Sequence, residues 1–183
     1  EVDIVGVMQN MKLSFFDFML KVQRRIWIFM GSDSDLLVMN KAAETLSEFG
    51  VDHKVVVASA HRSPDYLHRL LKEAERDSGV YIAGAGGAAH LAGVIASQTL
   101  KPVIGVPIGT QMGGLDSLLS TVQMPKGVPV ATVAVDGAAN AAILALEILA
   151  LSDPELRSRL QTSRRKQAET IEAKAQDPFP IGL

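Results

Sequence analysis

From Arg25 onward, the sequence alternates short apolar runs with segments in which apolar residues recur every three or four positions. The apolar runs predict five strands, at residues 26–30, 54–58, 80–83, 103–106 and 130–135. Strands that are almost continuously apolar are typical of a parallel sheet covered by helices on both faces. The pattern therefore predicts an α/β fold with a central parallel sheet.

Two of the intervening segments carry clear helix signals. Asp33 or Ser34 is expected to cap a helix that stops at Gly50. The sequence Ser63-Pro64-Asp65 combines a capping residue, a proline for the first helical position and an acid for the first turn. It predicts the start of a second helix.

Three further helices are expected. Residues 88–98 and 140–151 consist largely of small or apolar side chains, which predicts helices that pack closely. A long polar helix should run from Pro154 to about Ala175. A helix too long and polar to be buried in one small domain often packs on a neighbouring subunit, so the sequence favours an oligomer.

The chain contains 183 residues, of which 48% are hydrophobic, and this is enough for one well-buried core. We expect one domain at residues 24–167. Residues 1–23 are interpreted as an N-terminal extension, and residues 168–183 as the end of the last helix and a tail.

Charge and composition exclude several classes of protein. The formal net charge of −2 provides no basic field to hold a nucleic acid backbone, so no nucleic acid partner is expected. No apolar stretch is long enough for a membrane span, so no membrane partner is expected either. The absence of cysteine excludes disulfides and favours the cytoplasm.

Three polar or glycine-rich turns follow predicted strands, at residues 31–35, 59–63 and 84–90. In open parallel sheets, ligands bind beyond the carboxyl ends of the strands. These turns should therefore converge on one binding site.

The first two turns carry the groups that a nucleotide requires. Gly31, Ser32 and Ser34 offer backbone N–H groups and hydroxyls for phosphate oxygens, and Asp35 can accept hydrogen bonds from ribose. The simpler interpretation of this turn is helix capping. The pair His61-Arg62 joins a proton carrier to a phosphate-binding cation, although both could equally be ligand contacts.

The third turn superficially matches a dinucleotide-binding pattern, in Gly84, Gly86 and Ala89. It follows the third strand, however, and no acid lies nearby to hold a ribose. His90, expected inside the following helix, could reach the same space, although a buried or interface histidine is the simpler interpretation. We expect no metal, because the turns supply too few acidic ligands.

Ordered blocks of sequence resemble the class I N5-carboxyaminoimidazole ribonucleotide mutase family. Gly31-Ser-Asp-Ser-Asp35, Ser59-Ala-His-Arg62 and Ala83-Gly-Ala-Gly-Gly-Ala-Ala-His-Leu91 are similar to its three substrate loops. Further matching blocks are Pro102-Val-Ile-Gly-Val-Pro107 and Val122-Gln-Met-Pro125. The resemblance covers roughly residues 25–167.

The resemblance implies a three-layer, flavodoxin-like subunit that forms a homo-octamer, requires no cofactor and acts on a small nucleotide. Ser32, Asp35 and Arg62 would bind this nucleotide with support from Ser59, and His61 would transfer the proton. The other residues expected to contact the substrate are Ser34, Gly86, Gly87, Ala88, His90 and Leu91.

The activity implied is an isomerase step of de novo purine synthesis. N5-carboxyaminoimidazole ribonucleotide would lose CO₂ from N5 and regain it at C4, with His61 as acid and then base. Two alternatives remain at this point. A class II enzyme would carboxylate aminoimidazole ribonucleotide directly with CO₂, and a non-catalytic module would only bind the nucleotide.

Overall fold

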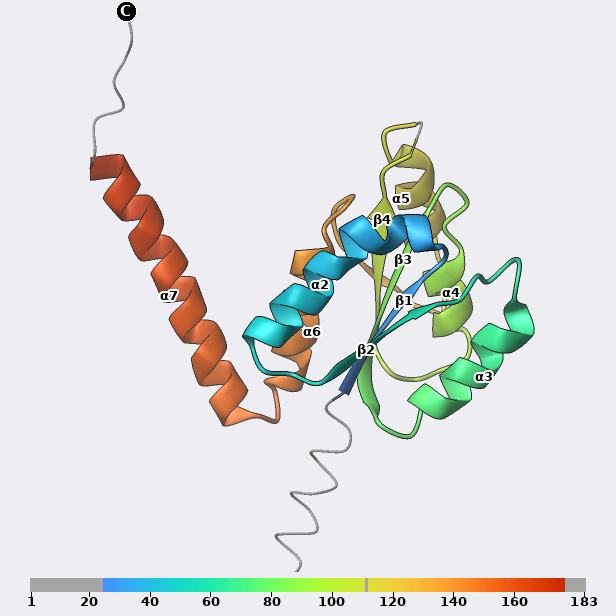
Figure 1. Ribbon diagram of the computed structural model, residues 1–183, viewed down its shortest axis with the longest axis horizontal. Helices are drawn as coiled ribbons and strands as arrows, with labels where there is room; N and C mark the ends of the chain where they lie inside the picture. Colours follow the sequence, from blue (N-terminus) through green and yellow to red (C-terminus); the bar gives the residue numbers. More distant parts are fainter. Residues whose placement is uncertain (1–24, 111, 177–183) are drawn as a thin grey trace, which may run out of the picture.

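The computed structural model describes residues 25–110 and 112–176, which form a three-layer α/β sandwich with a projecting C-terminal helix (Figure 1). Its sheet has five parallel strands in the order β2-β1-β3-β4-β5. The strands are β1 (Arg25–Met30), β2 (His53–Val57), β3 (Ser78–Gly86), β4 (Val103–Ile108) and β5 (Ala131–Thr132). This is the flavodoxin-like order, so the predicted fold class is confirmed.

Side chains alternate between the two faces of the sheet and form one apolar cluster on each. Ile26 and Ile28 of β1 face α2 (Leu36–Glu48) and α6 (Ala138–Leu149). Trp27 and Phe29 point the opposite way. Their cluster includes α3 (Pro64–Ala74) and α4 (Leu91–Ala96), while α5 (Leu115–Val122) packs beside β4.

The predicted bounds of two strands were wrong. β3 is longer than residues 80–83 and includes two of the glycines that we expected in a turn. A Cβ on Gly84 would lie 2.2 Å from Sδ of the buried Met39, so the missing side chain lets α2 pack on the strand. β5 contains two residues, where residues 130–135 were predicted.

The helix starts also differ in part from the predictions. Ser32, and not Asp33 or Ser34, is the first cap, and a short 3-10 helix η1 (Asp33–Asp35) precedes α2. The predicted end of this helix at Gly50 is confirmed by a left-handed φ of 60°. α4 begins at Leu91 instead of residue 88, and α5 was not predicted.

The last helix, α7 (Pro154–Gln176), confirms the predicted long C-terminal helix and leads away from the sandwich (Figure 1). Its first half is held: Leu156 and Leu160 are buried in the core, Arg159 Nη1 donates to the Phe49 carbonyl over 2.6 Å, and Arg164 pairs with Glu147 of α6. From Arg164 to Lys174 its side chains are exposed.

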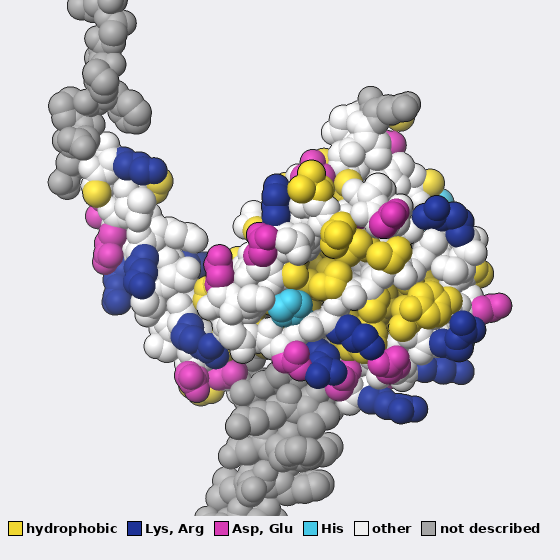
Figure 2. Space-filling view, viewed as in Figure 1, with side chains coloured by type: hydrophobic (Ala, Val, Ile, Leu, Met, Phe, Trp, Pro, Cys, Tyr) yellow, Lys and Arg dark blue, Asp and Glu magenta, His cyan; other side chains and the backbone are white. Residues whose placement is uncertain are grey.

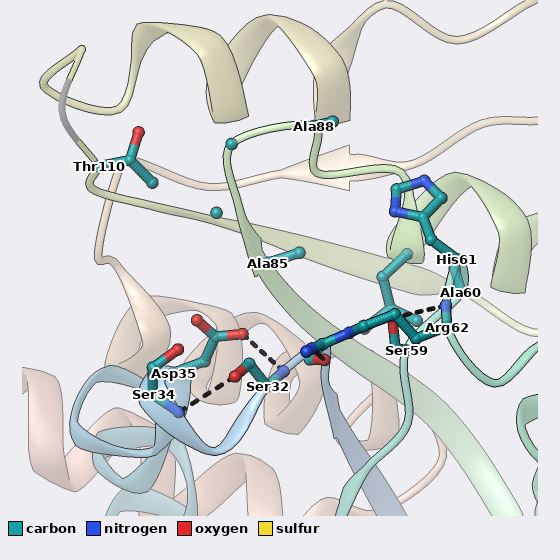
Figure 3. Close-up of a pocket in the computed structure, with 14 residues that line it drawn as sticks. Ser32, Ser34, Asp35, Ser59, Ala60, His61, Arg62, Ala85, Ala88 and Thr110 are labelled. Atoms are coloured by element: carbon teal, nitrogen blue, oxygen red, sulfur yellow. Dashed lines mark hydrogen bonds between the residues drawn. The ribbon is translucent and has the colours of Figure 1, made fainter.

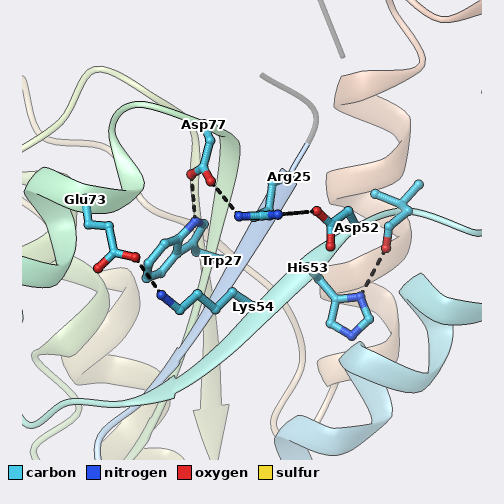
Figure 4. Close-up of polar contacts among 8 residues, drawn as sticks. Arg25, Trp27, Asp52, His53, Lys54, Glu73 and Asp77 are labelled. Atoms are coloured by element: carbon cyan, nitrogen blue, oxygen red, sulfur yellow. Dashed lines mark hydrogen bonds and ion pairs between the residues drawn. The ribbon is translucent and has the colours of Figure 1, made fainter. Parts of the chain in front are cut away.

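A polar network fastens the amino-terminal end of the sheet, opposite the predicted binding site (Figure 4). Arg25 bridges Asp52 and Asp77, with a nitrogen–oxygen distance of 2.7 Å to each. Trp27 Nε1 donates to Asp77 Oδ1 over 3.0 Å, and Lys54 Nζ lies 4.2 Å from the indole centroid. The network therefore ties β1 to β2 and to the segment before β3.

Candidate functional site

The three predicted turns meet in a pocket of about 450 Å³ at the carboxyl ends of the strands (Figure 3). Every predicted site residue except His90 lines this pocket: Ser32, Ser34, Asp35, Ser59, His61, Arg62, Gly86, Gly87, Ala88 and Leu91. The parallel topology therefore brings together residues that are as much as 59 positions apart in the sequence, as the strand-end argument predicted.

The turn after β1 is fixed by its own hydrogen bonds. The Ser32 N–H donates to Asp35 Oδ2 over 3.0 Å, and the Ser34 N–H donates to Ser32 Oγ over 3.4 Å. Burial raises the pKa of Asp35, although the Ser32 N–H bond and the positive charge of Arg62 act against that shift. This turn therefore caps η1 and lines the pocket at the same time.

The turn after β2 places the guanidinium of Arg62 against the turn after β1. Arg62 Nη2 donates to the Gly31 carbonyl over 2.9 Å, and the Arg62 N–H donates to Ser59 Oγ over 3.1 Å. Ser59 is held in turn by Ser63, whose hydroxyl accepts from the Ser59 N–H and donates to the Ser59 carbonyl. Ser63 therefore precedes α3 as predicted, but its side chain does not cap the helix.

His61 and His90 form a pair at the edge of the pocket. Their Nε2 and Nδ1 atoms lie 2.9 Å apart, and their rings are nearly perpendicular, at 87°. His90 immediately precedes α4 and is exposed, so its predicted place inside a helix was wrong. It lines an adjoining groove of about 380 Å³ between α4 and α5.

Sequence reasoning missed one polar residue of the pocket, Thr110, along with the small residues Ala60 and Ala85. Thr110 lies two residues beyond the end of β4, where the strand-end argument could have found it. Its hydroxyl donates to Asp116 in the first turn of α5.

Two further properties of residues 25–110 and 112–176 bear on the site. Histidine, aspartate and glutamate do not gather there in any group of three or more that could hold a metal ion. None of the helices in these ranges has the length and apolar character of a membrane span.

Comparison with known proteins adds to this geometry. The profile of the AIR carboxylase family matches residues 25–170, which include all of the pocket residues. The chain belongs to the AIR carboxylase family.

Individual members of the AIR carboxylase family are similar in sequence to this chain over most of its length. An N5-carboxyaminoimidazole ribonucleotide mutase of Pyrococcus horikoshii is 55% identical over 152 residues, or 82% of this chain and 86% of the relative. The mutase of Thermotoga maritima is 52% identical, over 86% of this chain and 94% of the relative. The crystal structure of Treponema denticola PurE matches with a TM-score of 0.77 at 28% identity, covering 85% and 99%.

Proposed function

We propose that this chain converts N5-carboxyaminoimidazole ribonucleotide into 4-carboxyaminoimidazole ribonucleotide in de novo purine synthesis. The observation that carries the proposal is that His61 and Arg62 lie on one turn of a single pocket (Figure 3). The same pocket is lined by a glycine-rich wall, which consists of Ala85, Gly86, Gly87 and Ala88. The mutase names of the relatives at 52–55% identity support the same reaction. No cofactor is part of the proposal.

The proposed binding roles follow from charge and hydrogen-bonding capacity. Arg62 and Ser32 hold the phosphate, because a guanidinium beside a hydroxyl group suits an oxyanion. Asp35 accepts from the ribose hydroxyls, and Ser59 holds Arg62 in place. The remaining proposed contacts are those of Ser34, Gly86, Gly87, Ala88, His90 and Leu91.

His61 is the proposed acid and base. When the N5–carboxylate bond breaks, its electron pair returns to nitrogen, which takes a proton from His61, and CO₂ is released. C4 then attacks the trapped CO₂, a carbon–carbon bond forms, and the C4 proton passes back to His61. No net proton is consumed, and holding both fragments in the pocket avoids a second encounter from solution.

We also propose a cytoplasmic homo-octamer in which neighbouring chains help to line each site. Exposed apolar side chains support assembly: Val57 of β2 is 46% exposed, and Leu37 at the start of α2 is 84% exposed. Figure 2 shows hydrophobic side chains gathered on one face of the sandwich. Light scattering should give the mass of eight 19.6-kDa chains. A monomer or dimer would contradict the octamer.

The catalytic domain is proposed to span residues 24–167, flanked by the extension of residues 1–23 and the tail of residues 168–183. The family match over residues 25–170 supports these bounds. Residues 1–24 and 177–183 lie outside the described structure.

The deciding experiment supplies purified protein with N5-carboxyaminoimidazole ribonucleotide, without bicarbonate or ATP. Formation of the 4-carboxy isomer supports the mutase. Turnover of aminoimidazole ribonucleotide with bicarbonate alone would instead identify a direct carboxylase, and binding without either reaction would leave a nucleotide-binding module.

A further inference from the structure

Thr110 is a polar residue of the pocket to which the proposed reaction assigns no role. It lies across the pocket from His61, on the segment that follows β4 (Figure 3). Its side chain is exposed in the single chain, so its hydroxyl can meet a ligand.

The direction of the Thr110 hydroxyl is fixed by its partner. Thr110 Oγ1 lies 2.9 Å and 2.8 Å from the two carboxylate oxygens of Asp116. An ionised carboxylate only accepts hydrogen bonds, so the hydroxyl proton points to Asp116. The lone pairs of Oγ1 remain free, and Thr110 therefore presents a hydrogen-bond acceptor.

The position of Thr110 is fixed from two further sides. A Cβ on Gly86 would lie 2.8 Å from Thr110 Cγ2, so the methyl group packs where a side chain is missing. The Gly109 N–H donates to Asp136 Oδ1 over 2.9 Å. Asp136 adopts a left-handed φ of 58°, a strained conformation that is typical of functional regions. The acceptor is therefore held against the glycine-rich wall.

We propose that Thr110 binds the substrate by accepting a hydrogen bond from the exocyclic N–H on carbon 5 of the imidazole ring. This inference rests on the proposed function. The phosphate and carboxylate of the substrate are acceptors and cannot bind a second acceptor, which leaves that nitrogen and the ribose hydroxyls. Asp35 is the proposed acceptor for the ribose hydroxyls, and the imidazole ring is proposed to lie against the glycine-rich wall beside Thr110. The N–H is present in both substrate and product.

The first test compares Thr110→Val, which keeps the shape but removes the acceptor, with Thr110→Ser, which restores a hydroxyl. Thr110→Val should raise KM for the substrate and Kd for the 4-carboxy product about tenfold, with a smaller change in kcat. Thr110→Ser should recover most of that loss. Thr170→Val on α7, far from the pocket, is the matched control, and thermal unfolding of each variant checks that it folds.

The second test uses the analogue of the 4-carboxy product that lacks the 5-amino group. Wild type and Thr110→Val should bind this analogue equally by calorimetry, because the donor is missing. If Thr110→Val weakens the binding of the product and of the analogue equally, or weakens neither, the inference is wrong. The proposed function would still stand if wild type turns over the substrate. If wild type neither binds nor converts the nucleotides, both proposals are overturned.

Discussion

His61 Nε2 and His90 Nδ1 lie 2.9 Å apart, so that one ring nitrogen donates a proton and the other accepts it. Two fully protonated imidazoles could not make this contact, because all four ring nitrogens would be donors. A protonated His61 can therefore be held only by a neutral His90. The second nitrogen of His61, Nδ1, is left for another partner.

Replacing the proposed proton carrier should separate catalysis from binding. In His61→Asn, turnover should fall by about 100-fold or more, because positioned acid–base catalysis contributes on this scale. The Kd for the 4-carboxy product should change by less than about threefold, since the phosphate and ribose contacts remain. Initial rates and calorimetry measure the two quantities. His68→Asn is the control, because His68 pairs with Gln98 on the surface. Full activity in His61→Asn would rule out the proposed carrier.

His90→Ala removes the hydrogen-bond partner of His61 and leaves the phosphate and ribose contacts intact. We expect kcat to fall about tenfold, the loss that accompanies one hydrogen bond, with a smaller rise in KM from the loss of the proposed ligand contact. An increase in KM with an unchanged kcat would make His90 a ligand contact that does not position His61.

Arg62→Ala should weaken nucleotide binding by about 10- to 100-fold, because a charge-assisted contact to phosphate is lost. The effect on kcat should be smaller, since His61 remains in place. Arg62→Lys keeps the charge without the planar fork and should recover only part of the affinity. Arg69→Ala, on the outside of α3, is the control. Equal affinities in all three variants would contradict the phosphate role.

Asp35 links the pocket to the pH dependence of folding. Burial raises the pKa of Asp35, so the folded chain binds this proton more tightly than the unfolded chain does. As pH rises from the ordinary carboxyl pKa of 3.8 toward the raised value, the free energy of unfolding should therefore decrease. Urea titrations from about pH 4 to pH 7 measure this slope.

In Asp35→Asn, this pH slope should flatten while stability at neutral pH is maintained, because the amide oxygen can still accept from the Ser32 N–H. Nucleotide affinity should fall, since a charged acceptor for the ribose is replaced. A variant that loses stability at neutral pH and keeps the wild-type slope would show that burial of the charge is not the controlling factor.

Much of the fold could be predicted because the apolar pattern is strong where strands are buried on both faces. β1 from Ile26 onward and β4 are runs without polar side chains, and Pro64 marks the start of α3. β3 was predicted too short because glycine normally argues against a strand, whereas Gly84 is needed here for the approach of Met39. That reason lies in packing between distant elements and leaves no local signal.

The site, like the fold, could be predicted where the signal is local and not where it depends on contacts between distant elements. The turns after β1, β2 and β3 were predicted because their polar residues follow recognisable strands. The contact between His61 and His90 depends on how two loops 29 residues apart are oriented, and no sequence spacing encodes it. Thr110 follows β4 as the other polar residues follow their strands, but its partner Asp116 lies in α5, a helix that was not predicted.

The network around Trp27 also determines what tryptophan fluorescence can measure in this protein. Trp27 is the only tryptophan of the chain, is completely buried and hydrogen-bonds to Asp77 at the amino-terminal end of the sheet. Gly31 at the pocket lies four positions further along the chain, roughly 13 Å away in an extended strand. Its fluorescence should therefore report unfolding of the sandwich and remain nearly silent when a nucleotide binds, which gives the molecule an intrinsic optical probe of folding alone.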